Sequence, residues 1–199
     1  MPCCRSIGEQ SAFRFVSKRR TSPTERRLDD TKEFVVLVDE NDNEIGLAPK
    51  LNAHRMGELH RAFSVMLIDS QNRLLLQRRA FAKYHSGGRW ANTCCGHPRD
   101  GESVLDAAKR RLTEEMGIVS ELTPAGWFIY RADVGSGLIE HELDHLLIGR
   151  FDGDPVPTKS EVVEWRWSSL DEVRHDLAAQ PDTYAAWFPD ALRALERLR

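Results

Sequence analysis

The pattern of hydrophobic and polar positions predicts short strands along most of the chain. Short apolar runs end at polar, turn-forming segments, which is typical of strands joined by tight turns. In chain order the expected strands are Phe34–Val38, Glu44–Ala48, Ala62–Asp69, Leu74–Arg79, Trp127–Ala132, Leu138–Phe151 and Val162–Trp167. The first four form two hairpins, the second opened by His60, and residues 50–59 between them are expected to be a polar connection that holds His54.

Three other stretches repeat apolar residues every three or four positions, the spacing of one helix face. The best defined helix is expected to start at Ser103, with Asp106 in the capping-box position, and to end at Gly117. Two further helices are expected over residues 169–179 and 191–198. The inward positions of the three helices are Leu105, Ala108, Leu112 and Met116, then Leu170, Val173 and Leu177, then Leu192, Leu195 and Leu198. Strands, one helix, more strands and then helices predict a single α+β domain.

The composition is ordinary for one soluble domain. The chain has 199 residues, of which 41% are hydrophobic and 30% charged, enough for a sizeable core. Its formal net charge of −3 gives no reason to expect nucleic acid or an anionic membrane as a partner. We find no apolar run of membrane-spanning length and no signal-peptide core. The cysteines form two adjacent pairs, Cys3–Cys4 and Cys94–Cys95, which favours free thiols and a cytoplasmic location.

Residues 1–32 differ from the rest of the chain. Basic residues lie there among Ser, Thr and Gly with little apolar periodicity. We expect a flexible basic arm before a domain that covers residues 33–199. An organelle-targeting peptide or a contact for an acidic partner is the alternative, and the acids Glu9, Glu25, Asp29 and Asp30 weaken both.

The loop and helix around Ser103 have a characteristic residue spacing. It runs Gly96, five residues, Glu102, seven residues, Arg110, Arg111, Leu112, one residue, Glu114, Glu115, one residue, Gly117 and Ile118. This spacing resembles the Nudix box, G-x5-E-x7-R-E-U-x-E-E-x-G-U, where U is apolar. The resemblance implies a Nudix fold, an α/β/α sandwich around a mixed sheet. The alternative is a solvated amphipathic helix with Arg110–Glu114 and Arg111–Glu115 ion pairs.

One box position departs from the family pattern, because Arg111 stands where the family has a glutamate. Acids on one side of a short helix repel each other unless a cation lies among them, and a divalent metal is the simplest such cation. In Nudix hydrolases the box glutamates assemble the magnesium site. A fixed cation at position 111 weakens that site and offers an anchor for a diphosphate instead.

A second set of motifs narrows the resemblance. The segments Ala91–Pro98, His60–Ser64 and Glu140–Glu142 resemble the type I isopentenyl-diphosphate isomerases, a Nudix branch, and the resemblance covers about residues 33–190. It implies an enzyme of isoprenoid precursor biosynthesis that interconverts isopentenyl and dimethylallyl diphosphate through a carbocation-like intermediate. The implied partner is this small molecule; the oligomeric state stays open, and a monomer is compatible with the sequence.

The resemblance also implies a metal site. Its ligands are His54, His60, His97, Glu140 and Glu142. Glu140 and Glu142 are two residues apart, so on a strand both carboxylates point the same way. Three imidazoles and two carboxylates suit Mg²⁺ or Mn²⁺, with Zn²⁺ also possible. The other nearby histidines match no family ligand and are expected on the surface or behind the ligands: His85, His141 and His145.

The catalytic residues implied by the resemblance are Cys95 and Glu142 as the acid–base pair, Tyr130 beside Glu142, and Trp187 as an aromatic face for the cation. Which of Cys95 and Glu142 delivers the first proton stays open, and Cys94 is expected to be a small core residue. The implied diphosphate contacts are Lys50, Arg79, Lys83 and Arg111. A second Mg²⁺ is expected to arrive with the substrate, bound by Glu115 and the main-chain carbonyl of Cys95.

Two other functions compete with the isomerase. A Nudix hydrolase of nucleoside diphosphates would leave Cys95 and the histidines unexplained, and would have an acid at position 111. A Nudix-derived binding module would be expected to have lost a catalytic residue, yet all of the implied ones are present.

Overall fold

The computed structural model describes residues 33–198, and the expected arm, residues 1–32, lies outside the described residues. The strands are β1 Phe34–Val38, β2 Glu44–Pro49, β3 His60–Ile68, β4 Leu74–Arg79, β5 Trp90–Ala91, β6 Cys94–Gly96, β7 Leu122–Gly135, β8 Leu138–Arg150 and β9 Val162–Ser168. The helices are α2 Lys50–Met56, α3 Val104–Met116, α4 Leu170–Ala179 and α5 Phe188–Glu196, with a 3₁₀ turn at Pro181–Thr183.

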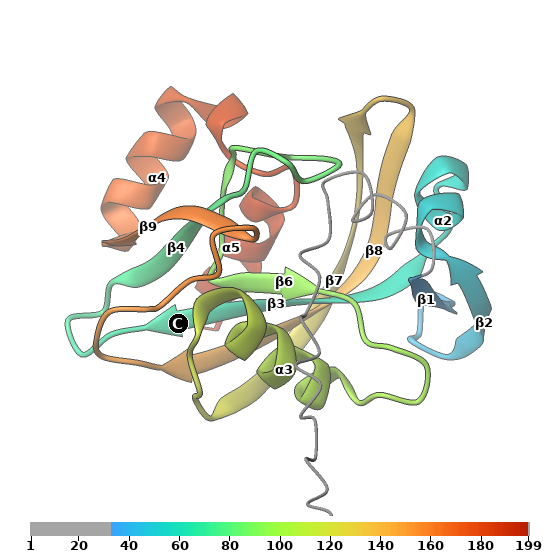
Figure 1. Cartoon of the computed structure of the whole chain (residues 1–199), viewed down its shortest axis with the longest axis horizontal. Helices are drawn as coiled ribbons and strands as arrows, with labels where there is room; N and C mark the ends of the chain where they lie inside the picture. The colour runs from blue at the N-terminus through green and yellow to red at the C-terminus, as the bar shows by residue number, and fades with distance from the viewer. Residues whose placement is uncertain (1–32, 199) are drawn as a thin grey trace, which may run out of the picture.

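Strand β3 lies at the centre of a mixed sheet (Figure 1). It runs parallel to β8 over its whole length, from the pair His60 and Glu142 to the pair Ile68 and Arg150. Its other neighbours, β1, β6 and β4, are antiparallel to it. Strand β8 also pairs with β7, and β4 pairs with β5 and β9. The register of β3 and β8 therefore sets the relative positions of two predicted metal ligands, His60 and Glu142.

The predicted hairpin of β3 and β4 is confirmed only next to its turn. The strands pair at Ile68 and Leu74, next to the turn, and then separate. Beyond that point Thr93 bridges them: the Leu67 amide donates to Thr93 Oγ1 (2.9 Å), and this hydroxyl donates to the Leu75 carbonyl (2.8 Å). The separation leaves room for β6, which pairs with β3 and carries Cys95.

Helices cover both faces of the sheet, as Figure 1 shows. Alternate residues of β3, such as Val65 and Leu67, pack with α3 on one face. The residues between them, such as Met66, pack with α4 and α5 on the other face. Because successive residues of β3 pack against helices on opposite faces, the predicted α/β/α sandwich is confirmed. A strand covered on both faces in this way is apolar at successive positions.

Helix α3 confirms both predicted ends. Ser103 Oγ accepts a hydrogen bond from the Asp106 amide (3.1 Å), and Gly117 ends the helix with a φ of 67°. A Cβ at position 117 would lie 2.6 Å from the Val156 carbonyl oxygen, so this turn needs glycine for space as well as for its left-handed backbone. Of the predicted stripe, Ala108, Leu112 and Met116 are fully buried and Leu105 is partly buried.

Three predictions of local structure were wrong. Residues 50–59 contain helix α2 and not only a polar connection; Ala53 and His54 are its buried positions. Strand β7 begins at Leu122, ahead of the predicted start at Trp127. Leu198 does not face the core, because α5 ends at Glu196 and the Leu198 side chain is 52% exposed.

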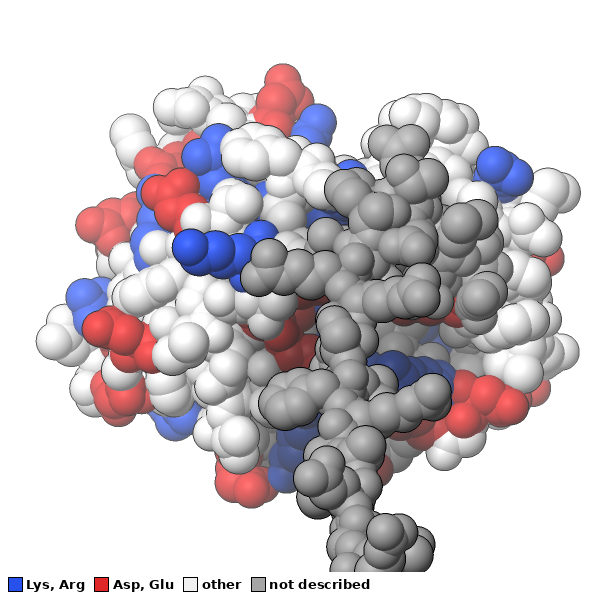
Figure 2. Space-filling view, viewed as in Figure 1, with Lys and Arg blue, Asp and Glu red and all other residues white. Residues whose placement is uncertain are grey.

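The visible surface mixes both signs of charge. Figure 2 shows Lys and Arg interspersed with Asp and Glu over the described residues of this face, without a wide field of one sign among them. Within residues 33–198 no helix has the length and apolar character needed to cross a membrane.

Candidate active site

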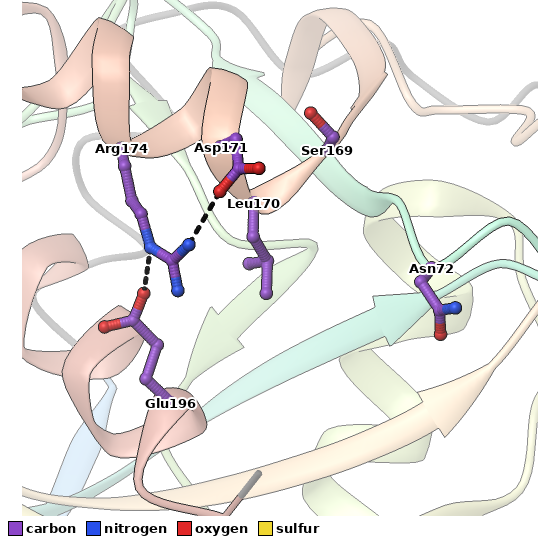
Figure 3. A pocket seen from close by; sticks show the side chains of 6 residues that line it. All are labelled: Asn72, Ser169, Leu170, Asp171, Arg174 and Glu196. Atoms are coloured by element: carbon purple, nitrogen blue, oxygen red, sulfur yellow. Dashed lines mark hydrogen bonds and ion pairs between the residues drawn. The ribbon is translucent and has the colours of Figure 1, made fainter.

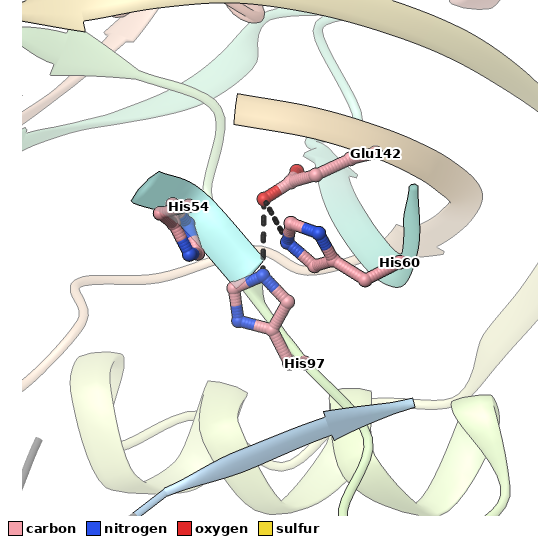
Figure 4. Close-up of side chains that lie close together, drawn as sticks. All are labelled: His54, His60, His97 and Glu142. Atoms are coloured by element: carbon pink, nitrogen blue, oxygen red, sulfur yellow. Dashed lines mark hydrogen bonds and ion pairs between the residues drawn. The ribbon is translucent and has the colours of Figure 1, made fainter. Parts of the chain in front are cut away.

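Four of the predicted metal ligands converge at one end of the central strands (Figure 4). Each of His54, His60, His97 and Glu142 offers a ligand atom, and these atoms all lie within 4.8 Å of one another. His54 comes from α2, His60 from the start of β3 and Glu142 from β8, while His97 directly follows β6. Segments far apart in the sequence thus meet because β3 pairs with both β6 and β8.

Backbone carbonyls fix the tautomers of two of these histidines. His54 Nδ1 lies 2.7 Å from the Lys50 carbonyl oxygen, and His60 Nδ1 lies 2.8 Å from that of Glu58. Since a carbonyl accepts only, each Nδ1 carries the proton and each Nε2 keeps a lone pair for a metal. His60 Nε2 is buried and has no hydrogen-bond partner among residues 33–198, and the nearest Glu142 oxygen lies 3.5 Å away, so its lone pair can bind a metal. The residues present therefore fit a divalent metal.

Burial keeps the imidazoles of His54 and His97 neutral. It lowers the pKa of His54 to about 3 and that of His97 to about 4, with the neighbouring histidines contributing to the shift of His54. Burial alone would raise the pKa of Glu142, but the nearby imidazoles of His60 and His97 bring it well below its usual range. Glu142 Oε1 lies 3.0 Å from His97 Nε2 and 3.5 Å from His60 Nε2. Neutral imidazoles and an ionised carboxylate are the states that bind metals.

Glu140 lies beside this group and not in it. Its Oε2 accepts from the Tyr130 hydroxyl (3.2 Å), and its Oε1 lies 3.1 Å from His85 Nδ1. Glu140 forms a second set of closely spaced ligand atoms with His54 and His85. Burial and the nearby Glu142 raise the pKa of Glu140 well above its usual value. The structure thus brings together four of the five predicted ligands and places the fifth next to them.

The remaining histidines separate into two kinds. His141 Nδ1 lies 3.0 Å from the Gly57 carbonyl, and His145 Nε2 lies 3.0 Å from Asp42, both away from the ligand cluster as expected. His85, in contrast, is buried against Glu140. Its position in a glycine-rich loop gave no periodicity from which this burial could be predicted.

Cys95 lies on β6 opposite Ser64 of β3. Arg79 donates from its terminal nitrogen to Cys95 Sγ (3.6 Å), but burial dominates and raises the pKa of the thiol to about 12. The thiol is therefore protonated at neutral pH, whereas Glu142 is ionised. Cys94 points to the opposite face and is buried among the α3 contacts, which confirms that it is a core residue.

Trp187 and Tyr130 form an aromatic wall that also contacts Cys95. Trp187 is buried and donates from its indole nitrogen to Asn92 Oδ1 (2.9 Å), while the Arg79 guanidinium lies 5.0 Å from its ring centre. Asn92 in turn donates to the Cys94 carbonyl (2.7 Å), so it ties β6 to Trp187. The Tyr130 hydroxyl donates to Glu142 Oε2 (2.6 Å), and its own pKa is raised well above the usual value by burial and the nearby acids.

Arginines neutralise the acids of the box helix. Arg110 holds Glu102 through two 2.7 Å hydrogen bonds, and Arg111 binds Glu114 (2.7 Å) and Glu115 (2.5 Å). The Arg110–Glu114 pair of the amphipathic-helix alternative is also present at 3.5 Å, so these ion pairs occur together with the Nudix arrangement. Guanidinium groups therefore lie among the acids of this helix, and the predicted second Mg²⁺ at Glu115 stays a prediction.

Two of the predicted diphosphate contacts meet at Glu161. Lys83 and Arg111 both form ion pairs with this carboxylate, the second at 3.1 Å. Lys50 pairs with Glu33 at 2.9 Å, and Arg79 is buried beside Cys95. The sequence did not single out Glu161, because an acid just before a strand is common and only the folded chain brings it to two cations.

A surface hollow elsewhere on the molecule has different chemistry. It has a volume of about 260 Å³ and lies against α4 (Figure 3). Its cation, Arg174, is already bound by Asp171 (2.8 Å) and Glu196 (2.7 Å). None of the predicted site residues lines it, so it is not the site described above.

Comparisons with known proteins identify the family. The NUDIX domain matches residues 58–188. "Isopentenyl-diphosphate Delta-isomerase 2" of Aromatoleum aromaticum is 53% identical over 161 residues, which cover 81% of this chain and 85% of the relative. The chain belongs to the isopentenyl-diphosphate Delta-isomerase family of the Nudix superfamily. Another member, from Serratia proteamaculans, is 48% identical and covers 82% of this chain and 91% of its own length.

Solved structures agree on the fold of this family member. A crystal structure from Deinococcus radiodurans has a TM-score of 0.68 at 20% identity, covering 81% of this chain and 98% of that one. The MutT protein of Methanosarcina mazei has a TM-score of 0.58, also at 20% identity, covering 70% and 94%. At such identity these likenesses show the Nudix fold alone.

Proposed function

We propose that this chain interconverts isopentenyl diphosphate and dimethylallyl diphosphate by adding one proton and removing another. The observation that carries the proposal is the pairing of a protonated thiol with an ionised carboxylate across one aromatic residue. Cys95 packs against the cluster that contains Tyr130, and Tyr130 donates to Glu142 Oε2 (2.6 Å). An acid–base pair that starts in opposite protonation states is what such a proton exchange needs.

The reaction assigns a task to each of these groups. A proton added to the terminal carbon of the alkene gives a tertiary cation, and loss of a proton from the carbon on its other side gives the allylic isomer. Cys95 and Glu142 exchange these two protons with the substrate, in an order that stays open. Trp187 supports the cation with its ring face, and Tyr130 keeps Glu142 oriented.

His54, His60, His97 and Glu142 would hold a divalent ion, with Glu140 as the fifth ligand. The histidine-rich set accepts Mg²⁺ or Mn²⁺ and also fits Zn²⁺. When bound, the ion withdraws electron density from Glu142 and makes its protonated form more acidic. The unpartnered His60 Nε2 supports this assignment.

The substrate diphosphate needs cationic partners. We assign this task to Lys50, Arg79, Lys83 and Arg111, with a second Mg²⁺ accompanying the substrate at Glu115 and the Cys95 carbonyl. The shared contact of Lys83 and Arg111 with Glu161 supports the assignment, because it brings two of the cations to one anionic group. Glu115 is buried, and Gln77 donates to its Oε2 (2.9 Å).

The test is a product assay with purified protein, Mg²⁺ and isopentenyl diphosphate, followed by proton and phosphorus NMR. We expect the dimethylallyl isomer to form without release of phosphate. Cys95→Ala should abolish turnover and keep its metal, whereas the matched control Cys94→Ala should stay active because Cys94 faces the core. Phosphate release without the isomer would favour a hydrolase, and neither product would favour a binding module.

Two further assignments complete the proposal. We infer that residues 33–199 are the catalytic unit and that residues 1–32 contribute no site residue. A cytoplasmic location stays a prediction; it suits a catalytic thiol, which has to remain reduced.

A further inference from the structure

His85 is a buried histidine that has no role in the site as proposed above. It lies in the loop between β4 and β5, and its side chain is 7% exposed. Nδ1 lies 3.1 Å from Glu140 Oε1, at the edge of the ligand cluster. A histidine is seldom buried in a loop without a polar partner that requires it there. The partner here is a carboxylate that belongs to the predicted metal set.

The His85 ring is fixed by aromatic neighbours on several sides. It makes an edge-on contact with Tyr84 at 4.3 Å between ring centres and another with Trp187 at 6.2 Å. The His54 ring lies 5.8 Å away. Ser86 Oγ, at 3.4 Å, is a second and longer contact of Nδ1. An imidazole confined in this way can hold a partner in one place, because little rotamer entropy remains to be lost.

Glu140 is held at both oxygens by these surroundings. His85 binds Oε1, and Tyr130 donates to Oε2 at 3.2 Å. The single proton of this hydroxyl is shared with Glu142, whose Oε2 is the closer acceptor at 2.6 Å. A chain of hydrogen bonds therefore runs from His85 through Glu140 and Tyr130 to the carboxylate that contacts His60 and His97. His85 stands at the outer end of this chain, where it fixes the one predicted ligand that lies outside the cluster of four.

We propose that His85 is a positioning residue that fixes Glu140 for the divalent ion held by His54, His60, His97 and Glu142. The inference rests on the proposed function, since it extends the metal site assigned there. His85 acts through Glu140 and is not itself a ligand. Partners that orient metal ligands typically change metal affinity by about 10- to 100-fold when they are removed. That range sets the expected effect of removing His85.

The experiment measures metal binding without substrate. Chelator-treated full-length protein is titrated with Mn²⁺ by calorimetry, for the wild type, His85→Ala, His85→Asn and the control His175→Ala. We expect Kd to rise by about 10- to 100-fold in His85→Ala. His85→Asn should recover much of the affinity, since its amide can donate to Glu140. His175, exposed on α4, should leave Kd unchanged.

Two outcomes would overturn the inference. One is a Kd for His85→Ala within twofold of the wild type, in protein whose circular dichroism and urea transition show it folded. The other comes from a double variant: if His85 acts through Glu140, adding His85→Ala to Glu140→Gln should weaken Mn²⁺ binding no further. A further loss in the double variant would make His85 a ligand in its own right.

The kinetic readout separates this inference from the function itself. His85→Ala, saturated with Mn²⁺, should recover much of its kcat, with KM little changed, because the diphosphate contacts are intact. If the wild type has no isomerase activity but the variants show the expected order of Mn²⁺ affinities, the proposed function is wrong and the role of His85 is supported. If the wild type is active but His85→Ala binds Mn²⁺ as tightly as the wild type, the proposed function is supported and the role of His85 is wrong.

Discussion

Replacing Thr93 by Val tests whether the bridge between the separating strands stabilises the fold. The two side chains have nearly the same shape, so the change leaves no cavity and removes only the hydroxyl. Thr93 is fully buried, and its Oγ1 accepts from the Leu67 amide (2.9 Å) and donates to the Leu75 carbonyl (2.8 Å). Both backbone groups would be left facing a methyl group in a dry interior.

The expected cost follows from these two contacts. A buried amide without a partner costs about 1–3 kcal/mol, and a carbonyl, which has two lone pairs, costs about 1 kcal/mol, so we expect about 2–4 kcal/mol in total. Domains of this size are stable by about 5–15 kcal/mol, and the loss is therefore a large fraction of the whole.

The assay is urea denaturation followed by circular dichroism, with the midpoint and slope compared between variants. The matched control is Thr113→Val, an exposed threonine on α3 whose hydroxyl donates to the Lys109 carbonyl (3.0 Å). Its cost should stay within about 0.5 kcal/mol, because water replaces the lost partner. Equal midpoints for Thr93→Val and Thr113→Val would refute the reasoning, since the bridge would then contribute nothing.

Three further predictions concern the core, the ligands and pH. Leu112→Ala should destabilise the protein by about 2–5 kcal/mol in urea, because it opens a cavity between α3 and the sheet; a loss below 1 kcal/mol would contradict that packing. Glu142→Gln should weaken Mn²⁺ binding at least tenfold in calorimetry and keep the fold, and unchanged binding would remove Glu142 from the metal set. The pKa values of His54 (about 3) and His97 (about 4) lie below the ordinary 6.5, so the unfolded chain binds more protons in acid. Each of these histidines should therefore cost metal-free protein about 1.4 kcal/mol per pH unit below pH ~6.5, while the raised pKa of Glu140 acts in the opposite direction. NMR titration separates the groups, and a His54 or His97 ring that becomes protonated near pH ~6.5 would contradict its burial.

Local patterns gave the elements of the fold. The apolar run of β3 and the cap residues of α3 act between neighbours in the chain, so they predicted a strand and both helix ends. The box spacing and the motif Ala91–Pro98 also lie within short segments, and they predicted the family. Helix α2 was missed, because apolar spacing does not mark its inner face: His54 is buried and Met56 is exposed.

The site depended more on the tertiary structure. The resemblance named His60 and Glu142, but only the parallel register of β3 and β8 explains why they meet. Asn92 belongs to a quoted motif, yet its task of holding the Trp187 indole depends on a residue far along the chain. Glu161 carried no sequence signal, because its significance comes from the two cations that fold onto it.

The sequence by itself determined the family, the two-faced sheet and most of the polar groups at its end, since these follow from spacing and periodicity within short segments. Only the tertiary structure decided how those groups divide among tasks. It placed Glu140 with His85, put the protons of His54 and His60 on Nδ1, and paired the acids of the box helix with arginines. The reason is physical: protonation states and ligand sets depend on burial and on contacts between distant segments, and those exist only once the strands have paired.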